Sequence, residues 1–313
     1  MEIRGVCPIA PAVFTDAGEV DREGYEHCCR EMIRHGAQAL TLFGIAGEYY
    51  KLDRDEEEIL MESTVRICHE NHLPVIVSNT RHSTECAVKW AKHIESSGAD
   101  CMMVLPPFFL KPGGAALFAH IDAVCSSVRI PVMFQYAPEQ TGVAIAPEIL
   151  AELAKKHQNL AYFKIECKPP GAYISKLRKL LPENRGIFVG NAGFQMIEGF
   201  RRGAVGVMPG PSMPDVYRGI WEALLAGDSE TAQKLHDQLN ALLNHIRQNV
   251  EMIIHFEKEI LKRRGFVKSA YCRKPGFVSD PVSDALFEEL YGRIRKEFRE
   301  EGESGCSVWK MKP

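Results

Sequence analysis

The sequence predicts an α/β fold, a (β/α)8 TIM barrel with a helical extension at its C-terminal end. The main observation is that eight short apolar runs alternate with longer segments of helical periodicity, separated by turns containing Gly or Pro. The length agrees, because 313 residues is usual for one barrel with extra helices. Strand–helix repetition favours parallel strands with right-handed crossovers, and eight repeats favour a closed barrel over an open sheet.

Each predicted strand is a continuous apolar run, as expected of strands that are buried on both faces. The runs cover residues 6–14, 39–43, 74–78, 101–105, 131–134, 160–165, 186–189 and 204–208. The predicted helices between them cover residues 21–35, 53–71, 84–97, 113–127, 146–157, 171–181 and 193–202. Asp21 can cap the first helix, and acidic residues in the first turn of the second suit the helix dipole.

After Met208 the alternation stops, and only helical patterns follow, at residues 214–226, 228–250, 252–265 and about 283–302. No linker-like composition separates the two patterns. We therefore predict a barrel over residues 1–212 and a helical extension packed on it over residues 213–313.

Composition excludes several classes of function. The chain has 38 Lys and Arg against 41 Asp and Glu, a net charge of −3, without the basic excess of a nucleic-acid-binding protein. None of the 10 cysteines forms a CxxC pair, so we predict no metal site and a reducing compartment. Neither a signal peptide nor a run long enough to span a bilayer is visible. We expect a cytoplasmic protein that does not bind membranes.

Lys164 is the first candidate catalytic residue, because it lies within the apolar strand Tyr162-Phe163-Lys164-Ile165-Glu166. Burial favours the neutral form of an amine, and a neutral amine can attack a carbonyl group to form a Schiff base. Alternatively, the lysine extends its head to solvent or pairs with Glu166. Side chains alternate along a strand, so Glu166 shares a face with Lys164 and is a candidate charge partner or proton carrier. It can equally cap the next turn.

Motifs in order along residues 1–300 resemble the dihydrodipicolinate synthase / N-acetylneuraminate lyase family. The resembling segments are Pro11-Ala12-Val13-Phe14, Gly44-Ile45-Ala46-Gly47-Glu48, Gly98-Ala99-Asp100 with Pro106-Pro107-Phe108-Phe109, residues 131–142, and Phe163-Lys164-Ile165-Glu166. The resemblance implies a barrel enzyme without a cofactor that binds a small 2-oxo acid as a Schiff base on Lys164. It also implies a homotetramer.

The sequence departs from this family at the groups that relay protons. The family's threonine pair is replaced by Ile45 and Ala46, and a tyrosine of its PPYY segment by Phe109. The tyrosine on strand five is replaced by Gln135, and the arginine that holds a second carboxylate by Gln140. These losses argue against the usual synthase or sialic acid lyase.

Tyr136 follows Gln135 and is a candidate replacement for the lost phenol. Period-2 alternation opposes this, because one of two neighbouring residues faces away from the barrel centre. Tyr136 can return only if the chain leaves the strand there, which Pro138 allows.

The segments Gln135-Tyr136-Ala137-Pro138, Tyr162-Phe163-Lys164-Ile165-Glu166 and Gly265-Phe266-Val267-Lys268-Ser269 resemble the 2-keto-3-deoxy-L-arabonate dehydratases, whose second residue in the first segment is Asp. Dehydration requires no phenol at strand five, whereas a retro-aldol reaction does. We therefore predict a dehydratase, with Glu166 as the base and Gln135 orienting a hydroxyl or a water.

In this family the backbone of the GTTGE loop binds the substrate carboxylate, so the resemblance assigns that role to Ile45, Ala46 and Gly47. Gly190 and Met208, at the ends of strands seven and eight, complete the predicted substrate-binding set. Two alternatives remain open: a pyruvate-dependent aldolase or synthase, and a catalytically weak barrel that only binds a 2-oxo acid.

Overall fold

The computed structural model describes residues 2–301 and 308–311 and divides into two compact units. Unit 1 contains Met1–Arg4 and His72–Met208, and unit 2 contains Gly5–Asn71 and Pro209–Pro313. Along the chain, strands β1 to β8 alternate with helices, and helices α9 to α12 follow β8. This is the element order of a (β/α)8 barrel with C-terminal helices, as the sequence predicts. The predicted boundary at residue 212 stays a prediction.

Unit 1 contains six parallel strands that pair in chain order. They are β3 (Val75–Asn79), β4 (Cys101–Val104), β5 (Val132–Tyr136), β6 (Leu160–Ile165), β7 (Gly186–Val189) and β8 (Gly206–Val207). Almost all of their residues are buried, which explains why the sequence shows continuous apolar runs.

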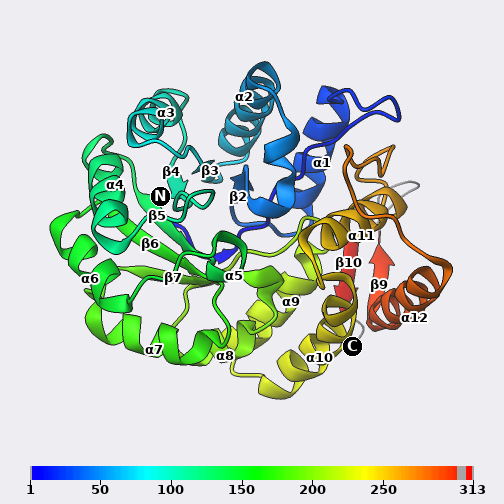
Figure 1. Cartoon of the computed structure of the whole chain (residues 1–313). Helices are drawn as coiled ribbons and strands as arrows, with labels where there is room; N and C mark the ends of the chain where they lie inside the picture. Colours follow the sequence, from blue (N-terminus) through cyan, green and yellow to red (C-terminus); the bar gives the residue numbers. More distant parts are fainter. Residues whose placement is uncertain (1, 302–307, 312–313) are drawn as a thin grey trace. The chain divides into compact units, whose positions relative to one another are not determined.

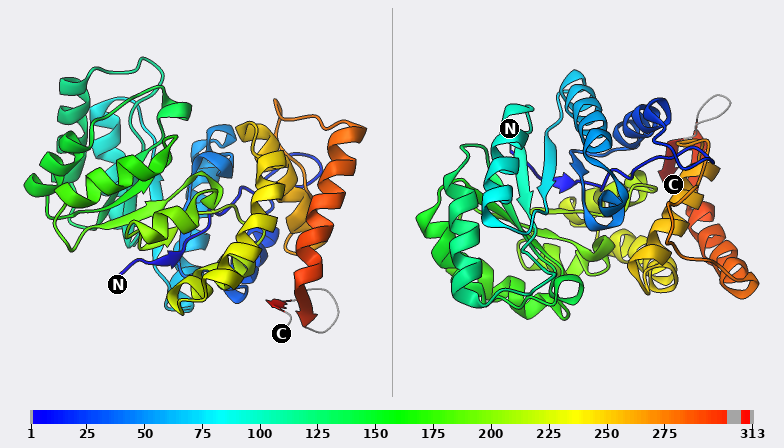
Figure 2. Two further views of the ribbon diagram at one scale, coloured as in Figure 1. Left: turned by 90° about the horizontal axis from the view of Figure 1, so that it is seen from below. Right: turned by 45° about the horizontal axis from the view of Figure 1, so that its top comes forward.

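Helices α3 (Thr84–Ser96), α4 (Gly114–Ser126), α6 (Pro147–Lys156) and α7 (Pro170–Leu180) lie on the outer side of these strands (Figure 1; Figure 2). Two short helices, α5 (Pro138–Thr141) and α8 (Met196–Arg201), follow β5 and β7. The carboxyl ends of the strands are therefore left to loops and short helices, where side chains that carry chemistry can collect.

Strand β5 is longer than its apolar run predicts, because it continues through Gln135 and Tyr136. Gln135 pairs with Lys164 and Tyr136 with Ile165, so the parallel ladder with β6 persists although polar residues have begun. A register shift between Val132 and Met133 precedes this part of the ladder. The strand therefore carries Gln135 to the position directly beside Lys164.

Unit 2 contains the short strands β1 (Gly5–Val6) and β2 (Leu40–Leu42) and most of the long helices. The helices are α1 (Arg22–Arg34), α2 (Arg54–Glu70), α9 (Pro214–Leu225), α10 (Ser229–Ile246), α11 (Val250–Arg263) and α12 (Pro281–Glu297). Strands β9 (Phe298–Glu301) and β10 (Val308–Met311) form an antiparallel pair, which was not predicted. The helix predicted over 283–302 therefore ends earlier, and its predicted last residue lies outside the described ones.

The first predicted strand, residues 6–14, was wrong in its extent, since β1 ends at Val6. Pro8 and Pro11 have no N–H group and cannot complete a ladder. A single bridge between Ile9 and Thr41 continues the pairing, with Ala10 N donating to Thr41 O at 2.8 Å.

Asp21 caps α1 by accepting a hydrogen bond from Gly24 N. Asp53 forms a capping box with Glu56 at the start of α2. Both caps satisfy backbone N–H groups that have no partner within the helix.

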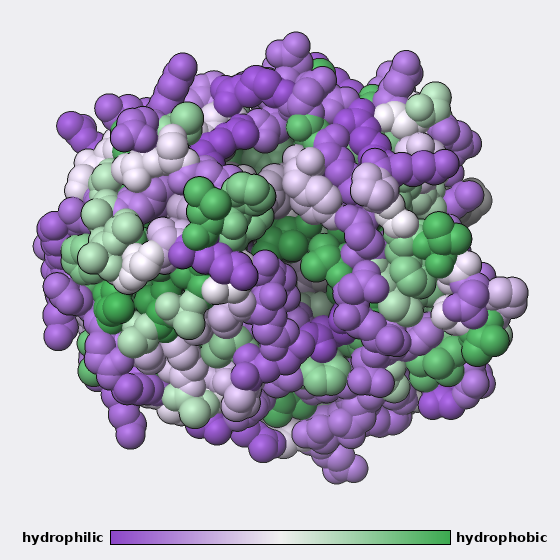
Figure 3. Space-filling view, viewed as in Figure 1, coloured by the Kyte–Doolittle hydropathy of each residue, from purple (hydrophilic) through white to green (hydrophobic). Residues whose placement is uncertain are grey.

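Hydrophilic residues cover most of the face seen in Figure 3, between smaller groups of hydrophobic ones. In the part of the chain that the structure describes, no helix combines the length and the apolar character that crossing a bilayer requires.

Candidate active site

Lys164 is buried in the middle of the sheet of unit 1, with 3% of its surface exposed. It stands on β6 between Gln135 of β5 and Phe188 of β7, which are its partners in the two ladders. Its Nζ lies 3.4 Å from Glu166 Oε1. The amine is thus removed from bulk water and has one carboxylate beside it, the setting in which a lysine serves as a nucleophile.

Glu166 is held by one donor from strand β5 and one from the turn that follows β7. Gln135 Nε2 donates to Glu166 Oε2 at 2.5 Å, and Asn191 N donates to Glu166 Oε1 at 2.8 Å. The backbone of Glu166 continues the ladder, since its N–H donates to Tyr136 O at 2.8 Å. Both oxygens of the carboxyl group are therefore engaged, and Oε1 is fixed toward Lys164. The structure brings Lys164, Glu166 and Gln135 together; their catalytic roles stay predictions.

Tyr136 lies in a different environment from Gln135. Its ring stacks on Tyr173 of α7, with centroids 4.5 Å apart and an interplanar angle of 23°. Burial raises the pKa of the Tyr136 phenol above its ordinary value. The condition for its return toward Lys164 was that the chain leave the strand, and β5 continues through this residue. The phenol therefore packs against α7, and the catalytic role of Tyr136 stays a prediction.

Gly190 leaves room for the side chain of Glu166. A Cβ atom at Gly190 would lie 2.2 Å from Glu166 Cγ and 2.5 Å from Glu166 Oε1. Gly190 therefore allows the carboxyl group of Glu166 to take its observed position, which any larger residue would obstruct. Asn191, which follows it, has a left-handed φ of 54° and presents its N–H to that carboxyl group. The sequence did not predict this backbone contact, because strand alternation says nothing about a loop amide.

If Glu166 is the predicted base, Gly190→Ala should displace it and lower kcat roughly 10- to 100-fold, since misplacing a catalytic group by about 1 Å can cost a factor of 10². The expected measurement is kcat together with borohydride trapping, and the trapped adduct on Lys164 should persist. Gly114→Ala is the matched control, because a Cβ at Gly114 meets no atom within 4 Å. Equal activity of the two variants would show that Glu166 is not held against Gly190.

Met208, the remaining predicted residue of unit 1, is 2% exposed and donates its N–H to Val189 O at 2.9 Å. Asn79 and His82, two other polar residues near strand ends, have structural contacts. Asn79 Nδ2 donates to Ala87 O at 2.8 Å, and the His82 ring packs on Phe108 at 4.5 Å between centroids. Substrate binding by Met208 stays a prediction.

In unit 2, residues Ile45–Gly47 form a 3-10 turn after β2. Ile45 and Ala46 are partly exposed, whereas Gly47 is buried and its N–H donates to Gly44 O at 2.8 Å. A Cβ at Gly47 would lie 3.0 Å from Ala10 O. The glycine is therefore required for packing on the first strand. Carboxylate binding by this turn stays a prediction, and Gly47 is its least available donor.

Among residues 2–301 and 308–311, no three or more His, Cys, Asp or Glu side chains are grouped so as to hold a metal ion. The groups that can carry chemistry in unit 1 are the amine of Lys164, the carboxylate of Glu166 and the amide of Gln135, at the ends of the adjacent parallel strands β5 and β6.

Known proteins share both the sequence pattern and the fold. The sequence profile described as the dihydrodipicolinate synthetase family matches residues 2–286. A 4-hydroxy-tetrahydrodipicolinate synthase of Exiguobacterium sibiricum is 31% identical over 242 residues, 77% of this chain and 81% of the relative. An L-2-keto-3-deoxyarabonate dehydratase of Azospirillum brasilense is 29% identical over 279 residues, 87% of this chain and 88% of the relative.

Among solved structures, a putative dihydrodipicolinate synthetase from Pseudomonas aeruginosa superposes with a TM-score of 0.87 at 25% identity. The superposition covers 94% of this chain and 100% of that chain. The predicted barrel fold is thereby confirmed over nearly the whole chain.

Proposed function

This chain belongs to the dihydrodipicolinate synthetase family and is a class I Schiff-base lyase, and we propose that it dehydrates a 2-keto-3-deoxy sugar acid of the 2-keto-3-deoxy-L-arabonate type. One observation carries the proposal: a buried Lys164 lies 3.4 Å from a carboxylate that Gln135 holds in place. No cofactor is required by this chemistry, because the lysine itself supplies the electron sink.

The reaction begins when the amine of Lys164 attacks C2 of the 2-oxo acid and water leaves, giving an iminium ion. The positive nitrogen acidifies the C3–H bond, and a base removes that proton to give an enamine. C3 is two bonds from the nitrogen, and Glu166 Oε1 lies 3.4 Å from that same nitrogen, so Glu166 is our candidate base. Protonated Glu166 returns its proton to the C4 hydroxyl group, which leaves as water and gives a conjugated iminium ion. Loss of a C5 proton and protonation at C3 convert this ion into the imine of the semialdehyde, and hydrolysis of the imine frees Lys164.

Gln135, which donates a hydrogen bond to Glu166, favours dehydration over cleavage of the C3–C4 bond. A retro-aldol reaction requires a group that takes the proton of the C4 hydroxyl, and a phenol does this in the family. Here that position is Gln135, whose amide holds Glu166 and cannot exchange protons near neutrality. The dehydratase relative of Azospirillum brasilense supports the same substrate class.

In unit 2, we propose that the backbone of Ile45, Ala46 and Gly47 binds the substrate carboxylate. In unit 1, Gly190 and Met208 are our proposed substrate-binding residues. A second candidate function is a pyruvate-dependent aldolase or synthase. The 31% identity to a 4-hydroxy-tetrahydrodipicolinate synthase favours it.

The test is borohydride trapping with pyruvate and, separately, with 2-keto-3-deoxy-L-arabonate, read by intact mass and peptide mapping. Product analysis without borohydride accompanies it. The proposal expects an adduct on Lys164 with the sugar acid and release of a dehydrated semialdehyde. Release of pyruvate and an aldehyde would establish the aldolase instead. Adducts without turnover would favour the catalytically weak barrel, and no adduct with either ligand would overturn the Schiff-base chemistry for both.

We also propose that the protein is a cytoplasmic homotetramer. Support for self-association is the loop after β4, where Phe109 and Leu110 are 80% and 85% exposed. Analytical ultracentrifugation at micromolar concentration should give four times the monomer mass of 35.1 kDa.

A further inference from the structure

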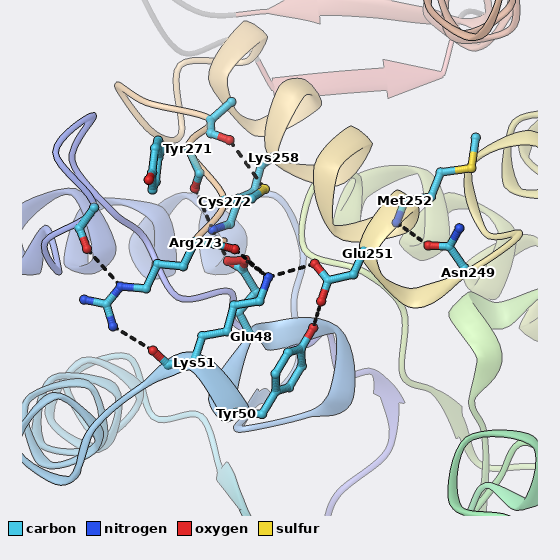
Figure 4. A network of polar contacts seen from close by, with 12 residues as sticks. Glu48, Tyr50, Lys51, Asn249, Glu251, Met252, Lys258, Tyr271, Cys272 and Arg273 are labelled. Carbon is cyan, nitrogen blue, oxygen red and sulfur yellow. Dashed lines mark hydrogen bonds and ion pairs between the residues drawn. The ribbon is translucent and has the colours of Figure 1, made fainter. Parts of the chain in front are cut away.

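Helix α11 carries a buried lysine, Lys258, directed at the loop that follows β2. Lys258 is 3% exposed, and its Nζ donates to Glu48 Oε2 at 2.5 Å and to Tyr271 O at 3.0 Å (Figure 4). The ammonium also lies 4.5 Å from the centroid of the Phe14 ring. Since a buried charge is tolerated only with good partners, the geometry of these contacts is closely specified.

A second lysine reaches the other oxygen of the same carboxylate. Lys51 Nζ lies 3.1 Å from Glu48 Oε1, 2.7 Å from Glu251 Oε2 and 2.7 Å from Arg273 O (Figure 4). Burial lowers the pKa of Lys51, but the hydrogen bond to Glu251 and the charge of Glu48 outweigh it and raise the pKa above its ordinary value. Lys51 therefore stays charged at neutral pH. Glu48, 0% exposed, is clamped from both sides.

The clamped residue ends the turn to which we assign the substrate carboxylate. Glu48 directly follows the Ile45–Gly47 turn and has left-handed dihedral angles, φ 58° and ψ 23°. A residue other than glycine adopts these angles only when its surroundings impose them. Gly47 O also accepts a hydrogen bond from Ala12 N at 3.1 Å. The side chain of Glu48 thus supplies the anchor that fixes the direction of the turn.

Helix α11 also holds a second loop, the one over residues 209–212. Glu257, next to Lys258 in the sequence, accepts a hydrogen bond from Ser212 N at 3.0 Å and is 3% exposed. A Cβ at Gly210 would lie 2.2 Å from Glu257 Oε1. Two neighbouring charged residues of one helix therefore each position a different loop, which makes α11 a supporting element for strand-end loops.

We propose that Lys258 and Lys51 are positioning residues that hold Glu48, so that the backbone of the Ile45–Gly47 turn keeps the geometry that we assign to binding the carboxylate of a 2-oxo acid. The proposal rests on the carboxylate role assigned to that turn. Neither lysine touches the substrate; both act through Glu48. Helix α11 thereby affects substrate affinity through the turn of its own unit.

The test compares Lys258→Met, which removes the charge at similar volume, with Lys262→Met, an exposed lysine on the same helix. In the free protein, the amides of residues 44–48 should exchange roughly 10-fold faster in Lys258→Met than in the wild type. In Lys262→Met their exchange rate should be unchanged. KM for the 2-oxo acid should rise roughly 10-fold with kcat nearly unchanged, because the lost interaction binds substrate and transition state alike.

Two further variants make the result decisive. Glu48→Gln combined with Lys258→Met should be no worse than the more damaging single variant, since both act at one contact. If Lys258→Met does not fold, Lys51→Met carries the same expectation. The proposal that the lysines position the turn would be overturned if amide exchange at residues 44–48 were unchanged in Lys258→Met. It would also be overturned if exchange along β6 accelerated equally. If the wild type forms no Schiff base, the proposed function fails. The exchange measurement needs no substrate, so it still tests whether the lysines position the turn.

Discussion

Lys164→Arg should abolish borohydride trapping with any 2-oxo acid and lower kcat/KM by at least about 10³-fold, the scale expected when a covalent nucleophile is lost. Arginine preserves the positive charge, but its guanidinium group stays protonated and cannot form an imine. A loss in this variant therefore reports nucleophilicity and not charge. The measurement is intact mass after borohydride, with peptide mapping of residues 160–168.

The matched control is Lys168→Arg, four residues along the same segment. The Lys168 side chain is 48% exposed and pairs with Glu139, so this exchange should leave trapping and turnover unchanged. An adduct that persists in Lys164→Arg would place the Schiff base on another lysine. It would also leave the contact with Glu166 without a chemical purpose.

The strands were predictable because burial on both faces leaves a direct trace in the sequence. Runs such as 101–105 and 160–165 coincide with β4 and β6 almost residue for residue. The predicted strand ends were wrong where the backbone pairing of a strand and its run of apolar residues do not end at the same residue. Pro8 and Pro11 cut the first strand short although the run continues, and Gln135 extends β5 beyond its run.

Only part of the site was predictable. Alternation along one strand places Lys164 and Glu166 on the same face, and they lie 3.4 Å apart. The hydrogen bond from Gln135 depends on the register between β5 and β6, which includes a shift that nothing in the sequence indicates. The contact between Lys258 and Glu48 joins positions 210 residues apart, and it follows only from the fold.

Glu166→Gln should lower kcat by roughly 10²- to 10⁴-fold, the range for loss of a general base, while the pyruvate adduct on Lys164 still forms. The amide has one acceptor oxygen, whereas the native carboxylate accepts from both Gln135 and Asn191. One of these donors therefore loses its acceptor in addition to the loss of basicity. The measurement is single-turnover formation of the semialdehyde alongside trapping, which separates imine formation from proton removal at C3.

Gln135→Leu distinguishes the base from the residue that holds it. This variant leaves the carboxylate in place and removes one hydrogen bond to it, so kcat should fall about tenfold, equivalent to about 1.4 kcal/mol. The order of the two effects is the informative result. A larger loss in Gln135→Leu than in Glu166→Gln would mean that the amide acts directly on the substrate hydroxyl. Full activity in Glu166→Gln would mean that another group removes the C3 proton, and that Glu166 serves only to orient the amine of Lys164.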